Sequence, residues 1–599
     1  MSQASIYQQR EAVFNIKLQG LKRYNLLFIL LKIALFLSIL VLMYQWMVHG
    51  WSLWWALGAT VAFGVVFKID QRFMKHLRLI EALQHINEQE SAAQEGDLRA
   101  FEAGTCYADG THAYSFDLDL FVPGGIYQYL NRTVTQEGAD ALAGYLAHMS
   151  TKETVIRARQ AAIAELSPLL EWRQMFAALG HHATVSLKGV LQHLREQPKD
   201  VTPVKSLWQW SSYLFIGFTF GALTLNVLGL VAYQLPLVLM LAQLMLWGSR
   251  MKATNRIHGR IDRFYQTFSG YNELLSHVAK PPAPFESDKL KEIAHQLTSP
   301  QTGAREAFAE LGRILGSFNQ RNNLLVSMVL NGLVMRDVLL MMRYRRWMHR
   351  WAADFPMWVD ALAEMDALVS LANYAYNHPG YAIPQLSTDE VLAAHDLGHP
   401  LISAQVRVCN DYRVDAMPHF HLVTGANMAG KSTFLRAVGV NLILASCGAP
   451  VCASQFRFRP MQLFSSMRTS DNLVNHTSYF QAELLRLKQL LDAAASSDGL
   501  FVILDEMLKG TNSRDKLAGS RLFLLKMLGF QSCGLVATHD LALGDLVQER
   551  PGRFTNICFE ITIGHDDIIY DYRLKPGLAH NLNATWLLER LIGKPDSDL

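Results

Sequence analysis

The stretch Gly425-Ala-Asn-Met-Ala-Gly-Lys431-Ser432 decides the fold of this chain. It matches the pattern G-x-x-x-x-G-K-[ST], whose glycines let successive backbone N–H groups face a phosphate chain at a helix N-terminus. An apolar run, His419–Thr424, precedes it, and a helical pattern beginning at Thr433 follows it. We therefore expect a phosphate-binding loop in which Lys431 contacts the β- and γ-phosphates of a nucleotide and Ser432 ligates Mg²⁺.

Two further apolar runs end in residues that suit the same chemistry. Leu500–Leu504 is followed by Asp505 and Glu506. In P-loop enzymes an acidic residue at this place holds the Mg²⁺, and the adjacent carboxylate can orient or deprotonate the attacking water. Gly534–Ala537 leads to His539, which we expect to sense the γ-phosphate because sheet ligands gather at strand C-termini. Strands that alternate with helical patterns after residue 400 predict a largely parallel α/β sheet.

Ser478 opens a helical pattern that continues to Leu491, with Gln481 three residues later as in a capping box. Two interpretations stay open from these residues. The segment is an ordinary helix start, or an exposed helix N-terminus that receives a phosphate from another subunit.

Composition limits the classes of function. The chain has 599 residues, half of them apolar, which suggests about four domains with buried cores. Its 55 Lys and Arg balance 52 Asp and Glu, so no overall basic field indicates nucleic-acid binding. The six cysteines are dispersed and form no C-x-x-C pair, which indicates neither a zinc ribbon nor a redox dithiol.

The apolar excess is concentrated in two stretches. Leu26–Phe67 contains a single charged residue, Lys32, and Leu207–Ser249 contains none. Because a membrane span needs about 20 apolar residues, each stretch is long enough to cross, turn near Val48–Gly50 or Tyr233–Gln234, and return. We interpret them as two transmembrane hairpins and expect Lys32 to extend back to the head groups. The alternative is a set of very apolar buried helices.

Basic residues flank both stretches and are absent from their turns. By the positive-inside rule both termini and the long polar segments lie in the cytoplasm, at a bacterial-type inner or plasma membrane that the chain crosses several times. The flanking residues are Arg10, Lys17, Lys22, Arg23, Lys68, Arg72, Lys75, Arg78, Arg250, Lys252 and Arg256. A third apolar run, Leu324–Met342, is interrupted by Arg336-Asp337 and predicts a buried helix.

These patterns divide the chain into six parts. The predicted parts are a cytoplasmic N-terminal segment (1–23), transmembrane hairpin 1 (24–68), the first part of a helical core or lever (69–205), transmembrane hairpin 2 (206–250), the second part of the helical lever (251–375) and the α/β domain (376–599).

Longer motifs around the same residues resemble the MutS family of mismatch-repair ATPases. Val423–Thr433 is similar to that family's T-G-P-N-M-G-G-K-S-T, and Asn427 and Met428 are the diagnostic positions. Asp505–Asp515 resembles D-E-I-G-R-G-T-S-T-x-D, and Ala537–His539 matches A-T-H. Weaker likenesses lie in Asp119–Thr135, His399-Pro400, Cys409–Asp411, Arg468–Leu473 and Ser478–Phe480.

The resemblance implies an ABC-type P-loop ATPase domain of α/β fold after an α-helical lever region, with ATP and Mg²⁺ as cofactors. It implies a homodimer in which Ser478 contacts the nucleotide in trans and Asp515 lies at the subunit contact. Glu506, Lys431 and His539 would be catalytic, and Ser432 and Asp505 would hold the Mg²⁺. The nucleotide-binding residues would be Gly425, Ala426, Asn427, Met428, Ala429, Gly430, Lys431, Ser432 and Thr433.

The chain departs from the family pattern at several points. Ala426 and Ala429 replace Pro and Gly, and Ala429 is compatible with the loop only if its φ is negative. Arg407 stands where the family often has an aromatic that stacks on adenine, a place that a guanidinium plane can take. The mismatch-sensing domain has no counterpart, because hairpin 1 occupies that region. Phe308-Ala-Glu310 spells that domain's F-x-E only within a helical pattern, which we interpret as coincidence.

The sequence thus predicts a membrane-anchored, MutS-like ATPase that couples its nucleotide cycle to lever movement, with the lipid bilayer and an unidentified protein as further partners. DNA binding and mismatch repair are implied by the resemblance alone. One alternative is a membrane-tethered DNA clamp. Another is an ABC-like transport engine, although spans without internal charge apart from Lys32 offer little to line a polar path.

Overall fold

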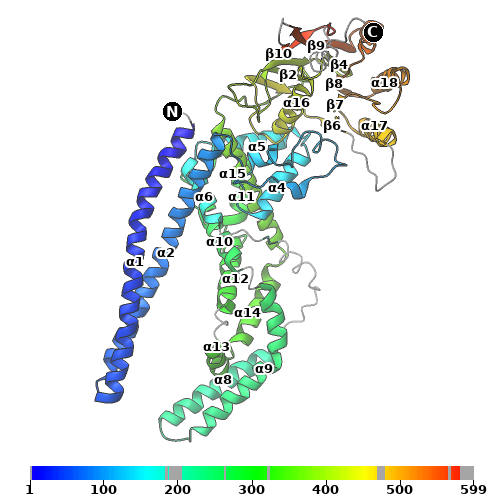
Figure 1. Ribbon diagram of the computed structural model, residues 1–599. Helices are drawn as coiled ribbons and strands as arrows, with labels where there is room; N and C mark the ends of the chain where they lie inside the picture. The colour runs from blue at the N-terminus through cyan, green and yellow to red at the C-terminus, as the bar shows by residue number, and fades with distance from the viewer. Residues whose placement is uncertain are drawn as a thin grey trace, which may run out of the picture.

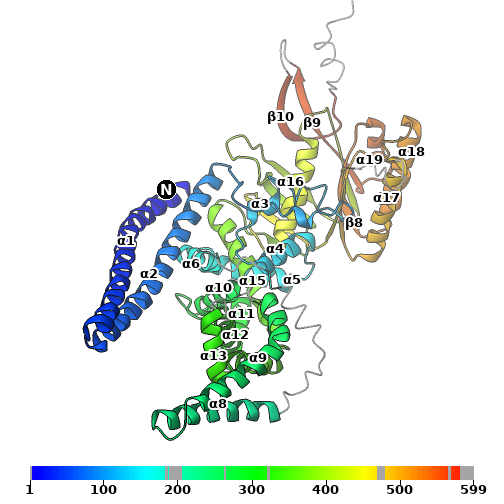
Figure 2. The same cartoon turned by 60° about the horizontal axis from the view of Figure 1, so that its bottom comes forward.

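The computed structural model describes residues 3–181, 186–187, 206–261, 265–319, 324–468, 479–563 and 568–580. An α/β unit formed by the C-terminal part of the chain lies at one end, and a helical body follows it (Figure 1). Two helical hairpins extend from the body in the same direction, as both ribbon views show (Figures 1 and 2). We call them prong 1, formed by α1 and α2, and prong 2, formed by α8 and α9.

Prong 1 consists of α1 (Gln3–His49) and α2 (Leu53–Gln94). The chain turns between them where the sequence predicts a turn, and the Ser52 side chain caps α2 by accepting a hydrogen bond from the Trp54 N–H. The expected position of Lys32 is wrong. Its ammonium lies 2.6 Å from Asp70 Oδ2 on the facing helix, and the Asp70 carboxylate is buried and needs a cationic partner.

Prong 2 consists of α8 (Ser206–Val227) and α9 (Gln234–Ile261). Polar side chains inside it bond to each other. The Gln243 amide donates to Thr219 Oγ1 at 2.7 Å and to the Phe215 carbonyl at 3.1 Å. Such internal pairing is what an apolar surrounding requires of polar groups.

The third apolar run is two helices, α13 (Leu324–Val334) and α14 (Arg336–Trp351), so the expectation of a single buried helix is wrong. Met335 leaves the helical conformation with φ +44°, and the Asp337 N–H then reaches Asn331 Oδ1 at 2.9 Å. Trp247 of α9 donates its indole N–H to the Asp337 carboxylate at 2.7 Å, which ties prong 2 to this break. In α13, Met328 and Val329 are exposed.

The helical body packs around α15 (Phe355–Asn377), most of whose residues are buried. Asp366, at its centre, is fully buried and accepts hydrogen bonds from the Val134 and Thr135 N–H groups and the Thr135 hydroxyl. Burial raises the pKa of Asp366 to about 7.

The other helices of the body are α3 (Ile126–Leu130), α4 (Gln136–Ala147), α5 (Glu153–Leu166), α6 (Leu170–Gly180), α10 (Tyr265–Val278), α11 (Asp288–Thr298) and α12 (Ala304–Asn319), with a 3₁₀ turn η1 (Thr105–Tyr107).

The α/β unit contains a six-stranded sheet in the order β10-β9-β4-β8-β7-β6, parallel except for the β9–β10 hairpin. This confirms the predicted parallel α/β architecture. A second sheet has the order β1-β5-β2-β3. The strands are β1 (Gln385–Leu386), β2 (Leu392–Leu397), β3 (Asn410–Val414), β4 (His419–Gly425), β5 (Gln455–Phe458), β6 (Gln462–Ser466), β7 (Leu500–Asp505), β8 (Ser532–Ala537), β9 (Phe554–Ile563) and β10 (Ile568–Pro576). The helices are α16 (Lys431–Ser446), α17 (Tyr479–Ser496), α18 (Ser513–Met527) and α19 (Leu546–Glu549), with a 3₁₀ turn η5 (Leu541–Asp545).

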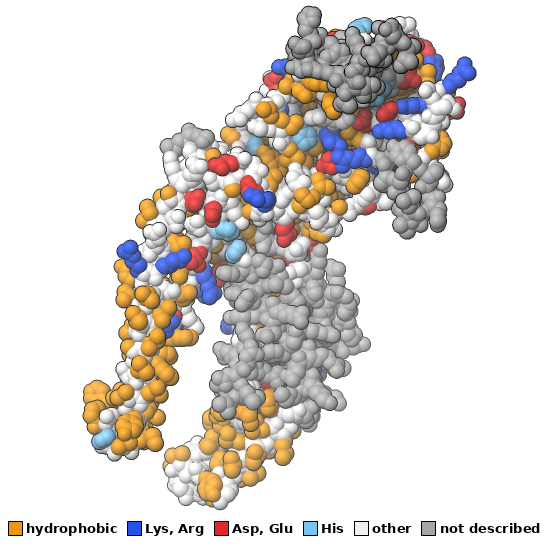
Figure 3. All heavy atoms as spheres, viewed as in Figure 1, with side chains coloured by type: hydrophobic (Ala, Val, Ile, Leu, Met, Phe, Trp, Pro, Cys, Tyr) orange, Lys and Arg blue, Asp and Glu red, His pale blue; other side chains and the backbone are white. Residues whose placement is uncertain are grey.

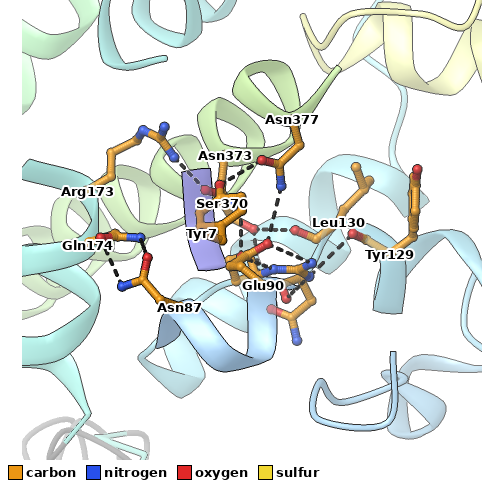
Figure 4. A network of polar contacts seen from close by, with 12 residues as sticks. Tyr7, Asn87, Glu90, Tyr129, Leu130, Arg173, Gln174, Ser370, Asn373 and Asn377 are labelled. Atoms are coloured by element: carbon orange, nitrogen blue, oxygen red, sulfur yellow. Dashed lines mark hydrogen bonds and ion pairs between the residues drawn. The ribbon is translucent and has the colours of Figure 1, made fainter. Parts of the chain in front are cut away.

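A buried polar network fastens prong 1 to the C-terminal end of α15 (Figure 4). Glu90 of α2 accepts hydrogen bonds from Arg132 at 2.5 Å, from Asn373 at 2.8 Å and from Asn377 at 3.2 Å. Tyr7 of α1 donates its hydroxyl to Asn377 Oδ1 at 2.7 Å. Both helices of prong 1 are therefore bound to the last turns of the helix that leads into the α/β unit.

Glu90→Gln should destabilise the protein by about 3 kcal/mol, because it leaves the Arg132 charge buried without its carboxylate. The matched control is Glu88→Gln on the same helix, since that carboxylate is exposed and pairs with His85 at 3.4 Å. Denaturant unfolding of the purified protein measures both effects. A Glu90→Gln variant with the stability of the control would show that the network contributes little.

Candidate active site

The C-terminal ends of three parallel strands bring the predicted site residues together. β8 lies between β4 and β7, with Val423 paired to Ala537 and Asp505 also paired to Ala537. The segments that follow these strands therefore leave from one edge of the sheet. They surround a cavity of about 540 Å³ that is lined by the phosphate loop together with Asp505, Glu506 and His539.

The phosphate loop joins β4 to α16 and depends on glycine at both ends. Gly425 has φ +152°, and a Cβ there would lie 2.6 Å from the Phe559 carbonyl oxygen. Gly430 has φ +108° directly before α16. Ala429 keeps a negative φ, as the sequence requires, but Met428 has φ +65° and a largely exposed side chain. This left-handed methionine was not anticipated, because the pattern places no glycine there.

Lys431 is buried at the start of α16, and its ammonium faces the loop. It donates to the Gly425 carbonyl at 2.7 Å and to the Ala426 carbonyl at 2.9 Å. Burial lowers the pKa of Lys431, and the nearby carboxylates Asp505 and Glu506 oppose that shift. Asn427 and Thr433 line the same cavity. A phosphate in the cavity would replace two neutral carbonyl partners of Lys431 with charged oxygens.

Ser432 and Asp505 meet across the cavity floor. The Ser432 hydroxyl donates to Asp505 Oδ2 at 2.7 Å. A hydroxyl beside one carboxylate fits Mg²⁺, which keeps several waters and binds through one or two carboxylates and substrate phosphates. Among the described residues no group of three or more His, Cys, Asp or Glu side chains forms a dedicated metal cage.

Glu506 and His539 occupy the side of the cavity next to Asp505. Glu506 has φ +60°, and its Oε1 lies 2.5 Å from the Lys516 ammonium. Burial acts to raise the pKa of Glu506, but the hydrogen bond and charge of Lys516 hold it below its usual range. Burial lowers the pKa of His539, and the charge of Lys431 lowers it further. Lys516 carries no motif signal and was missed.

The loop after Glu506 is tied to α17. The buried Glu483 accepts a hydrogen bond from the Lys509 N–H at 3.0 Å. Leu508, the residue before Lys509 in this loop, has φ +57°. Asp515 lies in the first turn of α18, where Asn512 Oδ1 accepts from its N–H at 2.9 Å. Ser478 and residues 469–477 lie outside the described residues, and α17 begins at Tyr479.

Arg407 lines the cavity together with His399 and Tyr572. Its Nη1 donates to the Tyr381 hydroxyl at 3.0 Å and to the Ile402 carbonyl at 3.2 Å. Tyr572 of β10 is a second planar side chain on this cavity, with φ +52°, and its ring stacks on Tyr570. The alternating Tyr570 and Tyr572 are the signal that sequence reasoning overlooked.

Comparison with known proteins agrees with this geometry. Residues 421–595 match the family described as MutS domain V. The DNA mismatch repair protein MutS of Lawsonia intracellularis is 29% identical over 344 residues, which are 56% of this chain and 36% of that protein. MutS of Myxococcus xanthus is 32% identical over 231 residues (37% and 25%), and human MutS protein homolog 4 is 29% identical over 234 residues (37% and 24%).

The matched segments thus span 24–36% of these relatives' lengths. MutS domain V is an ABC-type ATPase, so this chain carries an ATPase domain of that kind.

Acidic pH should destabilise the ATPase domain through His421 of β4. Burial lowers the pKa of His421 to about 3, and the adjacent His419 acts in the same direction. The unfolded chain, with an ordinary value near 6.5, binds the proton first, so stability is unaffected above about pH 6.5 and is lost as the pH falls toward 3.

The loss from this one group should approach about 1.4 kcal/mol per pH unit below pH 6. Denaturant unfolding at pH 7.5, 6.5 and 5.5 measures it, with His395→Gln as an exposed-histidine control and His421→Gln as the variant in which the dependence diminishes. An equal pH dependence in parent and His421→Gln would contradict the assignment.

Proposed function

We propose that this chain is a membrane-anchored ATPase of MutS type that binds and hydrolyses ATP with Mg²⁺ as a homodimer and couples the cycle to movement of its helical body and prongs. One observation carries the proposal. The phosphate loop, the Ser432–Asp505 pair and Glu506 surround a single cavity of about 540 Å³, large enough for a nucleotide.

Each side chain has a role that its position supports. Lys431 contacts the β- and γ-phosphates, and Ser432 and Asp505 hold Mg²⁺, which when bound neutralises charge on the phosphates. Glu506 lines the cavity beside them and accepts a proton from the attacking water. His539 contacts the γ-phosphate, and Arg407 stacks on the base. Ser478 reaches the nucleotide of the other subunit, with Asp515 near the same contact, as in the family that the ATPase domain resembles.

A continuous set of contacts supports coupling between the nucleotide cavity and prong 1. Arg407 on the cavity bonds to the Tyr381 hydroxyl, and the Tyr381 ring stacks on His378 with centroids 4.7 Å apart. His378 directly follows Asn377, the residue of α15 that bonds to Tyr7 and Glu90 of prong 1. A shift of Arg407 on nucleotide binding therefore acts on the fastening of prong 1 through packed groups.

The length, apolar composition and exposure of the prong helices support a membrane location. In the described part of the chain α1 and α2 are long and apolar enough to cross a membrane, and their most apolar windows are 0% and 11% buried. In prong 2, residues 212–227 and 234–248 form shorter apolar helices. Apolar side chains cover the outer parts of both prongs, which point the same way, and Lys and Arg gather nearer the body on prong 1 (Figure 3). This distribution suits insertion of both prongs into one bilayer from the cytoplasmic side.

The proposal does not include reading of mismatched DNA, although relatives bear mismatch-repair names. The Phe308 side chain of the F-x-E sequence is fully buried and packs on Phe355 with ring centroids 5.0 Å apart. A side chain held in the core of the body does not insert into a duplex. A transport path is not supported either, because Gln243 and Thr219 of prong 2 are bonded to each other.

Glu506→Gln should bind ATP with the parent's affinity but hydrolyse it roughly 10²- to 10⁴-fold more slowly, because an amide does not accept the water's proton. Lys431→Ala should instead weaken ATP binding by roughly tenfold to a hundredfold. Purified protein is assayed for nucleotide binding and phosphate release. The control is Glu549→Gln, a carboxylate outside the cavity that pairs with Arg521. Turnover by Glu506→Gln at the parent's rate would contradict the assignment of Glu506 as the base.

Topology is testable with cysteines. In intact cells a membrane-impermeant maleimide should label Trp51→Cys and Val231→Cys, at the turns of the two prongs, and leave the native exposed Cys106 unlabelled. In inverted vesicles the labelling should reverse, and in detergent all three should react. Labelling of Cys106 together with the turn cysteines in intact cells would refute membrane insertion.

A further inference from the structure

Lys516 is the cation in direct contact with Glu506. Its ammonium lies 2.5 Å from Glu506 Oε1, and the two side chains are only 20% and 28% exposed. Lys431 faces the same cavity but donates to loop carbonyls, and His539 and Lys509 act on Glu506 from farther away. A partly shielded ion pair holds its geometry better than a surface pair does.

The helix that carries Lys516 is itself well fixed. Asn512 caps α18, and its carbonyl accepts the Lys516 N–H at 2.9 Å. Leu508, in the loop that follows Glu506, packs so closely on α18 that a Cβ at Gly519 would lie 2.5 Å from its Cδ1. The Lys516 side chain therefore starts from a defined position relative to Glu506.

Glu506 needs a partner from another element to fix its side-chain torsions. It follows the last residue of β7 in the left-handed region, and its N–H donates to the Ala537 carbonyl at 3.0 Å, which fixes the backbone but leaves the side-chain torsions free. Lys516 binds Oε1, and among the described residues no hydrogen bond is made to Oε2. The carboxylate is thus held at one oxygen, while the residue lines the cavity.

We propose that Lys516 is a positioning residue that anchors Glu506 through Oε1 so that Oε2 is presented to the water attacking the γ-phosphate. The inference rests on the proposed function, because it needs Glu506 as the base. It assigns to Lys516 an orienting effect on the rate of turnover and none on nucleotide binding, since Lys516 does not line the cavity.

The test compares Lys516→Met, which keeps the length and removes the charge, with Lys516→Arg, which keeps a cationic donor. Lys526→Met is the matched control, an exposed lysine at the other end of α18. Turnover and KM for ATP are measured on the full chain in detergent or nanodiscs. Lys516→Met should lower kcat by roughly tenfold to a hundredfold with KM within about twofold of the parent, and Lys516→Arg should recover most of the loss.

A double-variant comparison separates this effect from general destabilisation. If Lys516 acts through Glu506, Lys516→Met should change nothing further in a Glu506→Gln background, whereas a structural defect would lower the residual rate again. Binding of a fluorescent ATP analogue reports that Lys516→Met is folded, and Lys516→Gln serves as a second neutral variant.

The outcomes distinguish the two proposals. A parental or higher kcat in both neutral variants, with Glu506→Gln inactive, would overturn the role of Lys516 and leave the proposed function in place. In particular, a rise in kcat would show that the ion pair with Lys516 slows the action of Glu506 as the base. Absence of ATP turnover in the parent would overturn both.

Discussion

The parallel pairing of β8 with β4 on one side and β7 on the other is the constraint on which the rest of the structure depends. Backbone hydrogen bonds set this register, so the phosphate loop, the acidic pair and His539 leave from one edge. The Ser432–Asp505 hydrogen bond joins residues 73 positions apart and exists only because of that register. A shift of one residue in β7 would turn Asp505 toward the opposite face.

Two lysines act on the acidic pair at the end of β7, one from within the cavity and one from beside it. Lys431 faces the cavity from the start of α16, and Lys516 binds Glu506 from the first turn of α18 without lining the cavity. The partners of Lys431 are neutral loop carbonyls, so this lysine can exchange them for phosphate oxygens, whereas Lys516 keeps its contact with Glu506. An anion-binding site prepared in this way has little reorganisation left for the moment of reaction.

A buried polar network holds the junction between prong 1 and α15. Glu90, Arg132, Asn373 and Asn377 form a network in which each side chain depends on the others, at the end of the helix that enters the ATPase domain. Buried networks of this kind are rigid when complete and costly when one member is lost. Prong 1 is therefore attached to the end of the helix that leads into the ATPase domain.

The sequence by itself determined the local chemistry. A contiguous motif fixes the phosphate loop, and apolar runs ending in Asp505-Glu506 and Thr538-His539 indicate strands of one parallel sheet, because short-range spacing encodes strand, loop and helix. The same kind of pattern predicted turns near Val48–Gly50 and Tyr233–Gln234, and the helices leave residues 50–52 and 228–233 between them.

Only the tertiary structure decided the pairings between distant segments. These include Lys32 with Asp70, Lys516 with Glu506, Tyr572 beside the phosphate loop, and Glu90 with the end of α15. None has a periodicity or motif, because a side chain's partner across the fold depends on how helices and strands pack and not on the residues next to it in the chain.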